Sequence, residues 1–100
     1  MAILQATLYR GTAPTSNGTL YAVPNGQEAV VTNIVVTNTT TATLSATISL
    51  DGVTIIDESP VSGNDVIVFD IKQVIASEEI IEGFASSSGL NFHISGVEIS

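Results

Sequence analysis

The sequence contains no cysteine and only two basic residues, and each shortage argues against a class of function. Without cysteine there is neither a disulfide framework nor a thiolate metal site, so the fold must be stabilised by packing and backbone hydrogen bonds. The two basic residues, Arg10 and Lys72, stand against ten acidic ones, which gives a net charge of -8. Nucleic acids and anionic lipid surfaces attract clustered basic side chains, so we expect neither as a direct partner. The acidic excess favours a basic or neutral protein partner.

Long apolar runs and an export signal are also missing. No uncharged apolar stretch approaches the ~20 residues that a membrane-spanning helix requires. The start, MAILQATLYRG, has no basic flank, no unbroken apolar stretch and no small-residue cleavage site. Hydrophobic residues nevertheless make up 44% of the 100 residues, against 12% that are charged. We therefore expect a soluble globule, with residues 1–100 forming one domain around one core.

Residues with branched β-carbons dominate the composition. Val, Ile and Thr supply 35 of the 100 residues, and such side chains pack better on a pleated sheet than on a helix. Clusters of Gly, Asn, Asp, Ser and Pro separate runs of strand length. The sequence therefore predicts an all-β fold, an antiparallel two-sheet β-sandwich of jelly-roll type with about eight strands. The predicted strands span residues 2–9, 19–23, 28–38, 42–50, 53–57, 65–71, 79–86 and 90–99.

Two turns predict hairpins. Residues 42–50 alternate strictly between apolar and polar side chains, and the Asp51-Gly52 pair that follows favours a two-residue type I′ turn. We expect this hairpin to place Leu50 opposite Val53 and Ile48 opposite Ile55. Pro24-Asn25-Gly26 also has turn chemistry, and it predicts a second hairpin over residues 19–38.

The sequence predicts one further local feature, in the last strand, and leaves a second one open. In the last strand Val97 and Ile99 have the opposite parity to the earlier apolar residues, so Gly96 is expected to form a bulge that keeps the whole strand buried. Ser77-Glu78-Glu79 is the one place where a single helical turn could begin, because a Ser cap precedes two acids.

Two strands carry apolar side chains on both faces. In residues 28–38, Val30, Ile34 and Val36 share one parity while Ala29, Val31 and Val35 share the other, and residues 65–71 repeat the pattern. An apolar outer face is usually covered by a loop or another subunit, although single exposed valines are common. A closed homo-oligomer, a dimer or a trimer, is the simplest cover. The predicted oligomer interface consists of Val31, Val35, Val66 and Val68, extended by Ile56 and Ile81.

Candidate catalytic and metal-binding residues are few. The single histidine, His93, lies on a strand face with Asn91 and Ser95 that we expect to be solvated, and no nucleophile, phosphate-loop or dinucleotide motif accompanies it. We therefore expect no enzyme, no catalytic residue and no cofactor. A small hydrolase with His93 as its base is the alternative from a different class.

Acidic groups form no recognisable site either. Adjacent acids on a strand, such as Asp57 and Glu58, point to opposite faces, so they cannot act as a glycosidase pair with Asp65. Carboxylates at positions 78, 79 and 82 could attract calcium, but they lack a calcium-loop spacing. We expect no metal site and interpret these acids as a solvated edge.

Four segments carry a resemblance to a known family. They are RGTAPTSNGTLYAVPNGQEAVVTNIVVTNTT, TLSATISLDG, VIVFDIKQVI and NFHISGVEIS, and together they span nearly the whole chain. The sequence resembles small virion proteins encoded by tailed bacteriophages and their prophage relatives. Members of such a group resemble capsid decoration (cement) proteins or small tail and adhesion modules. The resemblance implies assembly on a particle, with no turnover and no cofactor.

The expected function follows from this resemblance and from the apolar surplus. We expect a structural virion protein, assembled in the host cytoplasm, that binds and reinforces a phage capsid as a homo-oligomer. Its partners would be further copies of itself and the major capsid protein or a tail protein. The alternative is a tail-associated or host-receptor-binding module whose loops at residues 10–18 and 86–89 contact the receptor.

Overall fold

The computed structural model describes residues 2–100, and within them it contains eight β-strands and no helix. The strands form two four-stranded antiparallel sheets, in the orders β1-β8-β3-β6 and β2-β7-β4-β5. This confirms the predicted antiparallel β-sandwich, and the order in which the chain passes between its sheets is that of a jelly roll. The strands are β1 (Ile3–Thr12), β2 (Gly18–Ala22), β3 (Glu28–Asn38), β4 (Leu44–Leu50), β5 (Val53–Val61), β6 (Val66–Ile75), β7 (Ile80–Ala85) and β8 (Leu90–Ile99).

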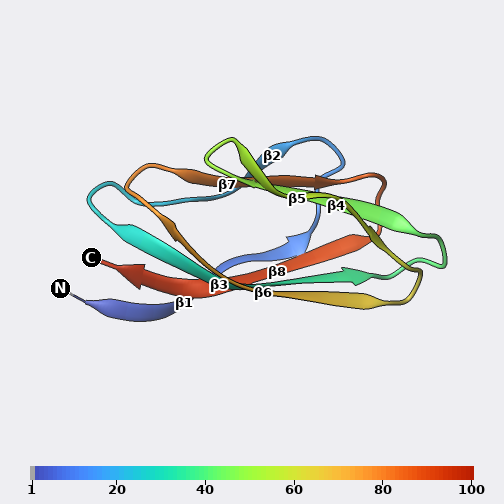
Figure 1. Cartoon of the computed structure of the whole chain (residues 1–100), viewed down its shortest axis with the longest axis horizontal. Helices are drawn as coiled ribbons and strands as arrows, with labels where there is room; N and C mark the ends of the chain where they lie inside the picture. Colours follow the sequence, from blue (N-terminus) through green and yellow to red (C-terminus); the bar gives the residue numbers. More distant parts are fainter. Residues whose placement is uncertain (1) are drawn as a thin grey trace.

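The two sheets lie as layers, one above the other, with their strands along the long axis of the molecule (Figure 1). We call the sheet containing β1 the lower sheet and the sheet containing β2 the upper sheet, as they appear in that view. The molecule measures 45 by 21 by 18 Å. Because the sheet orders end in β1 and β2 on one side and in β6 and β5 on the other, each long edge consists of one strand from each sheet.

The core fills the space between the layers. Its largest fully buried side chains include Phe92 and Ile94 of β8, Ile34 of β3 and Ile48 of β4, so both inner faces contribute. Alternation along each strand explains this arrangement, since every second side chain points inward. Burial of an aliphatic or aromatic side chain stabilises the fold by about 1.5–3 kcal/mol, which makes this layer the main source of stability.

One polar side chain is buried in the core. The Asn38 amide nitrogen donates to the carbonyl oxygens of Ala42 (2.7 Å) and Val61 (2.9 Å). Its oxygen accepts from the backbone nitrogen (2.9 Å) and the hydroxyl (2.7 Å) of Thr40. Asn38 therefore joins the loop after β3 to the end of β5, with both ends of its amide hydrogen-bonded.

The predicted hairpin between β4 and β5 is present, with two shifts of register along the pair. Asp51 and Gly52 have φ angles of 49° and 79°, as a type I′ turn requires, and Leu50 pairs with Val53. Ile48 pairs with Ile56, however, and the prediction of Ile55 is wrong. A bulge in β5 absorbs the extra residue and turns Ile56 into the core.

The predicted hairpin over residues 19–38 is wrong, although its turn exists. The backbone nitrogen of Gln27 donates to the carbonyl oxygen of Pro24 at 3.1 Å. The strands on either side belong to different sheets, because β2 pairs with β7 while β3 pairs with β6 and β8. Pro24-Asn25-Gly26 therefore carries the chain from one layer to the other, a distinction that turn chemistry alone does not encode.

The last strand contains no bulge, which corrects the prediction for Gly96. β8 keeps one phase from Leu90 through Gly96, while Val97 and Ile99 lie half-buried on its outer side. The bulges lie in the neighbouring strands, at Leu8 of β1 and Thr32 of β3. A Cβ atom on Gly96 would collide with the carbonyl oxygen of Val30. The backbone of β3 therefore approaches β8 more closely here than any residue with a side chain would allow.

No helical turn begins at Ser77. The backbone nitrogen of Glu79 donates to the carbonyl oxygen of Ala76 at 3.1 Å, and the Glu79 carboxylate accepts from the backbone nitrogen of Ala76 at 2.6 Å. These two bonds close a tight turn that leads from β6 to β7 in the other sheet. The acids after Ser77 therefore serve a turn between layers.

Candidate functional site

Three of the six predicted interface residues belong to the core. Val31, Ile56 and Ile81 are buried, so their assignment to an outer face is wrong. The bulge at Thr32 explains Val31, because it lets Val31 and Ile34 of one strand both point inward. The bulge at Ile55 turns the side chain of Ile56 into the core, and Ile81 faces inward from β7.

The other three residues do lie together on the outer face of the lower sheet. Val68 is 59% exposed and Val66 is 50% exposed. Val35 of β3 pairs with Val68 and is half-buried beside it. This outward placement agrees with the sequence pattern, while the role of Val35, Val66 and Val68 in an oligomer stays a prediction.

Further exposed apolar side chains lie along the same edge of the sandwich. Of the seven large hydrophobic residues exposed in residues 2–100, five lie on the neighbouring strands β5 and β6. Exposed apolar groups gathered on one surface are typical of an interaction site. We call this surface the β5–β6 edge; its exposed apolar residues are Val53, Ile55, Val66, Val68 and Val74.

The β5–β6 edge contains a groove of about 530 Å³ between the two sheets. Val53 and Val74, which line it, are 71% and 65% exposed. Sequence reasoning missed this groove because it ended the strands at residues 57 and 71. The β-branched pair Val74-Ile75 was the signal that the second strand continues. The apolar lining of the groove consists of Leu50, Val53, Ile55, Val74 and Ile75.

Two carboxylates, Asp51 and Glu79, also line this groove. The pKa of Asp51 is raised, first by desolvation, then by a hydrogen bond with the Glu79 side chain and by the negative charges of Glu79 and Glu82. These acids repel one another, so the groove combines an apolar lining with negative charge. Nowhere in residues 2–100 do three or more His, Asp or Glu side chains form a group that could hold a metal ion.

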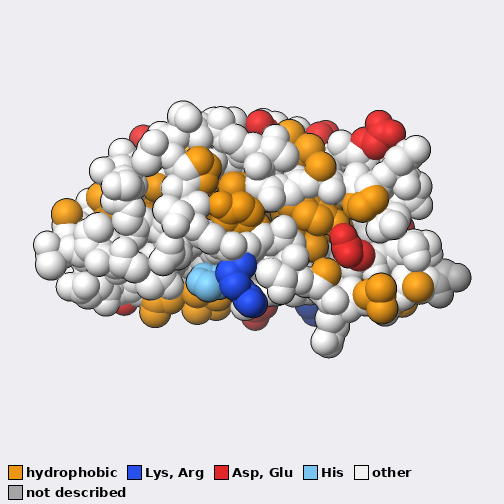
Figure 2. Space-filling view, turned by 180° about the vertical axis from the view of Figure 1, so that it is seen from behind, with side chains coloured by type: hydrophobic (Ala, Val, Ile, Leu, Met, Phe, Trp, Pro, Cys, Tyr) orange, Lys and Arg blue, Asp and Glu red, His pale blue; other side chains and the backbone are white. Residues whose placement is uncertain are grey.

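The opposite edge, formed by β1 and β2, has a different chemistry. Arg10 pairs in register with His93 on the lower sheet. Figure 2 shows this side, with the histidine beside a basic side chain and a band of apolar side chains along the middle. The other two exposed large hydrophobic residues, Ile3 at 61% and Leu4 at 63%, start β1. We call this surface the β1–β2 edge.

A hydrogen bond connects the two layers at the β1–β2 edge. The Tyr21 hydroxyl of β2 donates to the Glu98 carboxylate of β8 at 2.5 Å. The pKa of Tyr21 is strongly raised, chiefly by burial and then by the bond to Glu98 and its negative charge. This bond joins β2 of the upper sheet to β8 of the lower sheet.

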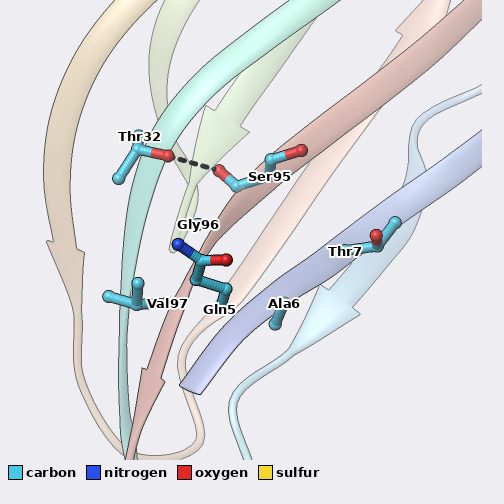
Figure 3. Close-up of a pocket in the computed structure, with 7 residues that line it drawn as sticks. All are labelled: Gln5, Ala6, Thr7, Thr32, Ser95, Gly96 and Val97. Carbon is cyan, nitrogen blue, oxygen red and sulfur yellow. Dashed lines mark hydrogen bonds between the residues drawn. The ribbon is translucent and has the colours of Figure 1, made fainter. Parts of the chain in front are cut away.

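A second hollow, of about 490 Å³, lies on the outer face of the lower sheet. Figure 3 shows Gln5 of β1, Thr32 of β3 and Ser95 of β8 around it, and the Thr32 hydroxyl donates to the Ser95 carbonyl oxygen at 3.2 Å. Its lining contains hydroxyl and amide groups but no charged and no aromatic side chain. His93 lies outside this hollow, between Arg10 and Val35.

The fold is shared with proteins of different functions. The Drosophila NLP core, whose structure is described in terms of pentamer formation and histone binding, matches with a TM-score of 0.54 at 17% identity over all of both chains. A capsid structure of Helicobacter pylori bacteriophage KHP30 contains a chain that matches with a TM-score of 0.55 at 10% identity, over 99% of this chain and 94% of that one. At such identities the likeness shows the fold alone.

No protein-family model and no curated protein matches the sequence. Among residues 2–100 there is no helix with the length and apolarity to span a membrane.

Proposed function

We propose that this chain is a structural protein of a phage particle, which binds and reinforces the capsid as a homo-oligomer. The observation that carries the proposal is the gathering of five exposed apolar side chains on the β5–β6 edge. A monomer gains nothing from exposing these groups, whereas an assembly buries them. The fold shared with a chain of a phage capsid structure also supports a structural role in a phage particle.

The proposed mechanism is mechanical. An oligomer that contacts two neighbouring shell subunits binds only the assembled shell, and binding to one state stabilises that state by mass action. Such clamping requires extensive contact surfaces, roughly 800 Å² on each partner for an interface of standard size. A net charge of -8 keeps the free protein from associating indiscriminately and favours neutral or basic patches on the shell.

Particles that lack the protein test this function. Their shells should open at lower temperature or lower salt than complete particles, and electron microscopy should show missing surface density. Adding back purified protein should restore both properties. Shells with unchanged stability and unchanged surface density would refute the reinforcing role.

A tail-associated or receptor-binding module is the second candidate. It is favoured by the hydroxyl-lined hollow on the lower sheet, which could bind a polar ligand. The absence of an aromatic side chain from its lining weakens this reading for glycans, because sugars stack on aromatic faces. Retention of the protein on host cells that is lost in Thr32→Val and kept in Thr43→Val, at an exposed position outside the hollow and both loops, would favour it over capsid binding.

We further propose that the chain is not an enzyme. His93, its single histidine, lies between Arg10 and Val35 in the register of the lower sheet, so neither in-register neighbour is a carboxylate that could orient it. A hydrolytic activity abolished by His93→Ala would overturn this part of the proposal.

A further inference from the structure

The outermost strands of the two long edges differ in charge, although Glu98 of β8 also lies at the β1–β2 edge, where the Tyr21 hydroxyl binds it. β1 and β2 contain one basic residue, Arg10, and no acidic one, whereas β5 and β6 contain Asp57, Glu58 and Asp70 against Lys72. Both edges also expose apolar groups, with Ile3 and Leu4 on one and the apolar groove on the other. Two surfaces that complement each other on opposite sides of one molecule favour head-to-tail contact between copies.

The complementary groups lie at matching heights along the strands. Following the hydrogen-bonded rows across the lower sheet, Leu4 is in the row of Glu98, Ala29 and Ile75, and Ile75 lines the groove. In the same way Arg10 shares a row with Val68. Asp70 lies two residues from Val68, about 7 Å along the strand, which is within reach of an arginine side chain.

We propose that copies of this chain assemble head to tail into a closed ring, with the β1–β2 edge of one copy packed against the β5–β6 edge of the next. A ring closes only when successive copies are related by rotation without translation along the axis. The matching heights satisfy this condition for an axis parallel to the strands. This inference rests on the homo-oligomer in the proposed function and specifies its geometry.

Strand direction is consistent with such a ring. Every neighbouring pair in the lower sheet is antiparallel, so β1 and β6, three positions apart, run in opposite directions. Rotation about an axis parallel to the strands preserves their directions. It therefore places β1 of the next copy antiparallel to β6, which continues the alternation of the sheet.

The occupant of the groove is a second copy. Ile3 and Leu4 of the next copy would fill the apolar groove, and Arg10 of that copy would approach Asp70. Each edge is at most about 45 by 21 Å, the two longer dimensions of the molecule. That footprint can supply the roughly 800 Å² per partner of a standard interface.

A symmetric dimer through the β5–β6 edge is the competing arrangement. It would bring the acidic groove of one copy against the acidic groove of another, and it would leave Ile3 and Leu4 exposed. Like charges brought together across an interface disfavour that contact. The two arrangements make opposite predictions for variants that block a single edge.

Two such variants test the ring. Leu4→Glu blocks the β1–β2 edge and Val74→Glu blocks the β5–β6 edge, both at exposed positions where folding should survive. Light scattering coupled to size exclusion should give an oligomer for the wild type and a monomer for each variant alone. An equimolar mixture should give a dimer and nothing larger, because only one contact between the two variants is intact. Ser87→Glu, in an exposed loop, adds the same charge and should leave the oligomer unchanged.

Other outcomes overturn the ring. A symmetric β5–β6 dimer predicts that Leu4→Glu keeps the wild-type mass and that mixing produces no new species. Oligomers that persist in both variants, with circular dichroism showing the native fold, would also refute it. A wild type that stays monomeric at high concentration removes self-assembly altogether, whereas binding to shells, measured separately, tests the capsid role.

Charge reversal tests the polar contact. Arg10→Glu should weaken the oligomer at least tenfold in its dissociation constant, and adding Asp70→Arg to the same chain should recover most of that loss. The Arg10→Glu, Lys72→Glu combination is the control, because it reverses a basic group without restoring the pair. Failure of Asp70→Arg to rescue would reject the Arg10–Asp70 contact.

Discussion

Replacing Asn38 with alanine should remove a large part of the stability of this fold. The Asn38 side chain makes four hydrogen bonds, to Ala42, Val61 and two groups of Thr40, and its exposed fraction is 1%. An intramolecular hydrogen bond contributes about 1 kcal/mol net. The four bonds together therefore contribute about 4 kcal/mol, and we expect a loss of about 3–4 kcal/mol because water reaches the Ala42 end of the network. This is a large share of the 5–15 kcal/mol that is typical of a small domain.

Urea unfolding followed by circular dichroism measures this loss. The free energy of unfolding should fall with urea concentration at the same slope in wild type and Asn38→Ala, while the midpoint should be lower in the variant. Asn91→Ala, at a half-buried position on the outer side of β8, is the matched control. It should lower the free energy of unfolding by less than about 0.5 kcal/mol. Both variants are compared at several protein concentrations, because self-association adds stability. A loss below about 1 kcal/mol for Asn38→Ala would show that the loop relaxes and that the reasoning from satisfied bonds fails.

Three further predictions concern single positions. Gly96→Ala should prevent folding or lower the melting temperature by many degrees, since its Cβ would collide with the Val30 carbonyl; a native-like melt would refute this. Tyr21→Phe should cost about 1–2 kcal/mol in urea unfolding by losing its bond to Glu98; an unchanged midpoint would contradict the role given to that bond. The raised pKa of folded Asp51 means that stability falls as pH rises between its unfolded and folded pKa values. Asp51→Asn should flatten this part of the pH profile, and an unaltered profile would reject the effect.

The proposed ring and the proposed capsid role place different demands on the surface. The ring uses the two long edges, which leaves the outer faces of both sheets and the loop ends for the shell. Val35 and Thr37 of β3 on the lower sheet then form a candidate contact with the particle, outside the β5–β6 edge that the next copy would cover. Capsid binding and self-assembly can therefore be tested by separate variants.

Much of the fold could be predicted from local patterns. The strict alternation from Leu44 to Leu50 and the Asp51-Gly52 turn were sufficient for the β4–β5 hairpin, and the bounds 28–38 and 90–99 agree with β3 and β8. These features depend on residues within a few positions of one another. Backbone preference and side-chain period therefore determine them before any tertiary contact forms.

The predicted interface shows where local patterns were insufficient. Val31, Val35 and Val66 look alike in sequence, yet the bulge at Thr32 places Val31 in the core and leaves the other two on the outer face. Such a bulge depends on how β3 pairs with β6 and β8, strands far from it in the sequence. A shift of one residue reverses the face of every side chain beyond it, so parity alone could not assign these residues.

The sequence by itself determined that the chain forms short β-strands, where most of them begin and end, and that it has few groups for catalysis. Tertiary structure alone decided which strands share a sheet, because pairing between distant segments has no local signature. It also decided that β5 and β6 meet at one edge and β1 and β2 at the other. The apolar groove and the β1–β2 edge exist only because the two sheets pack face to face, since each surface is formed by strands from both sheets.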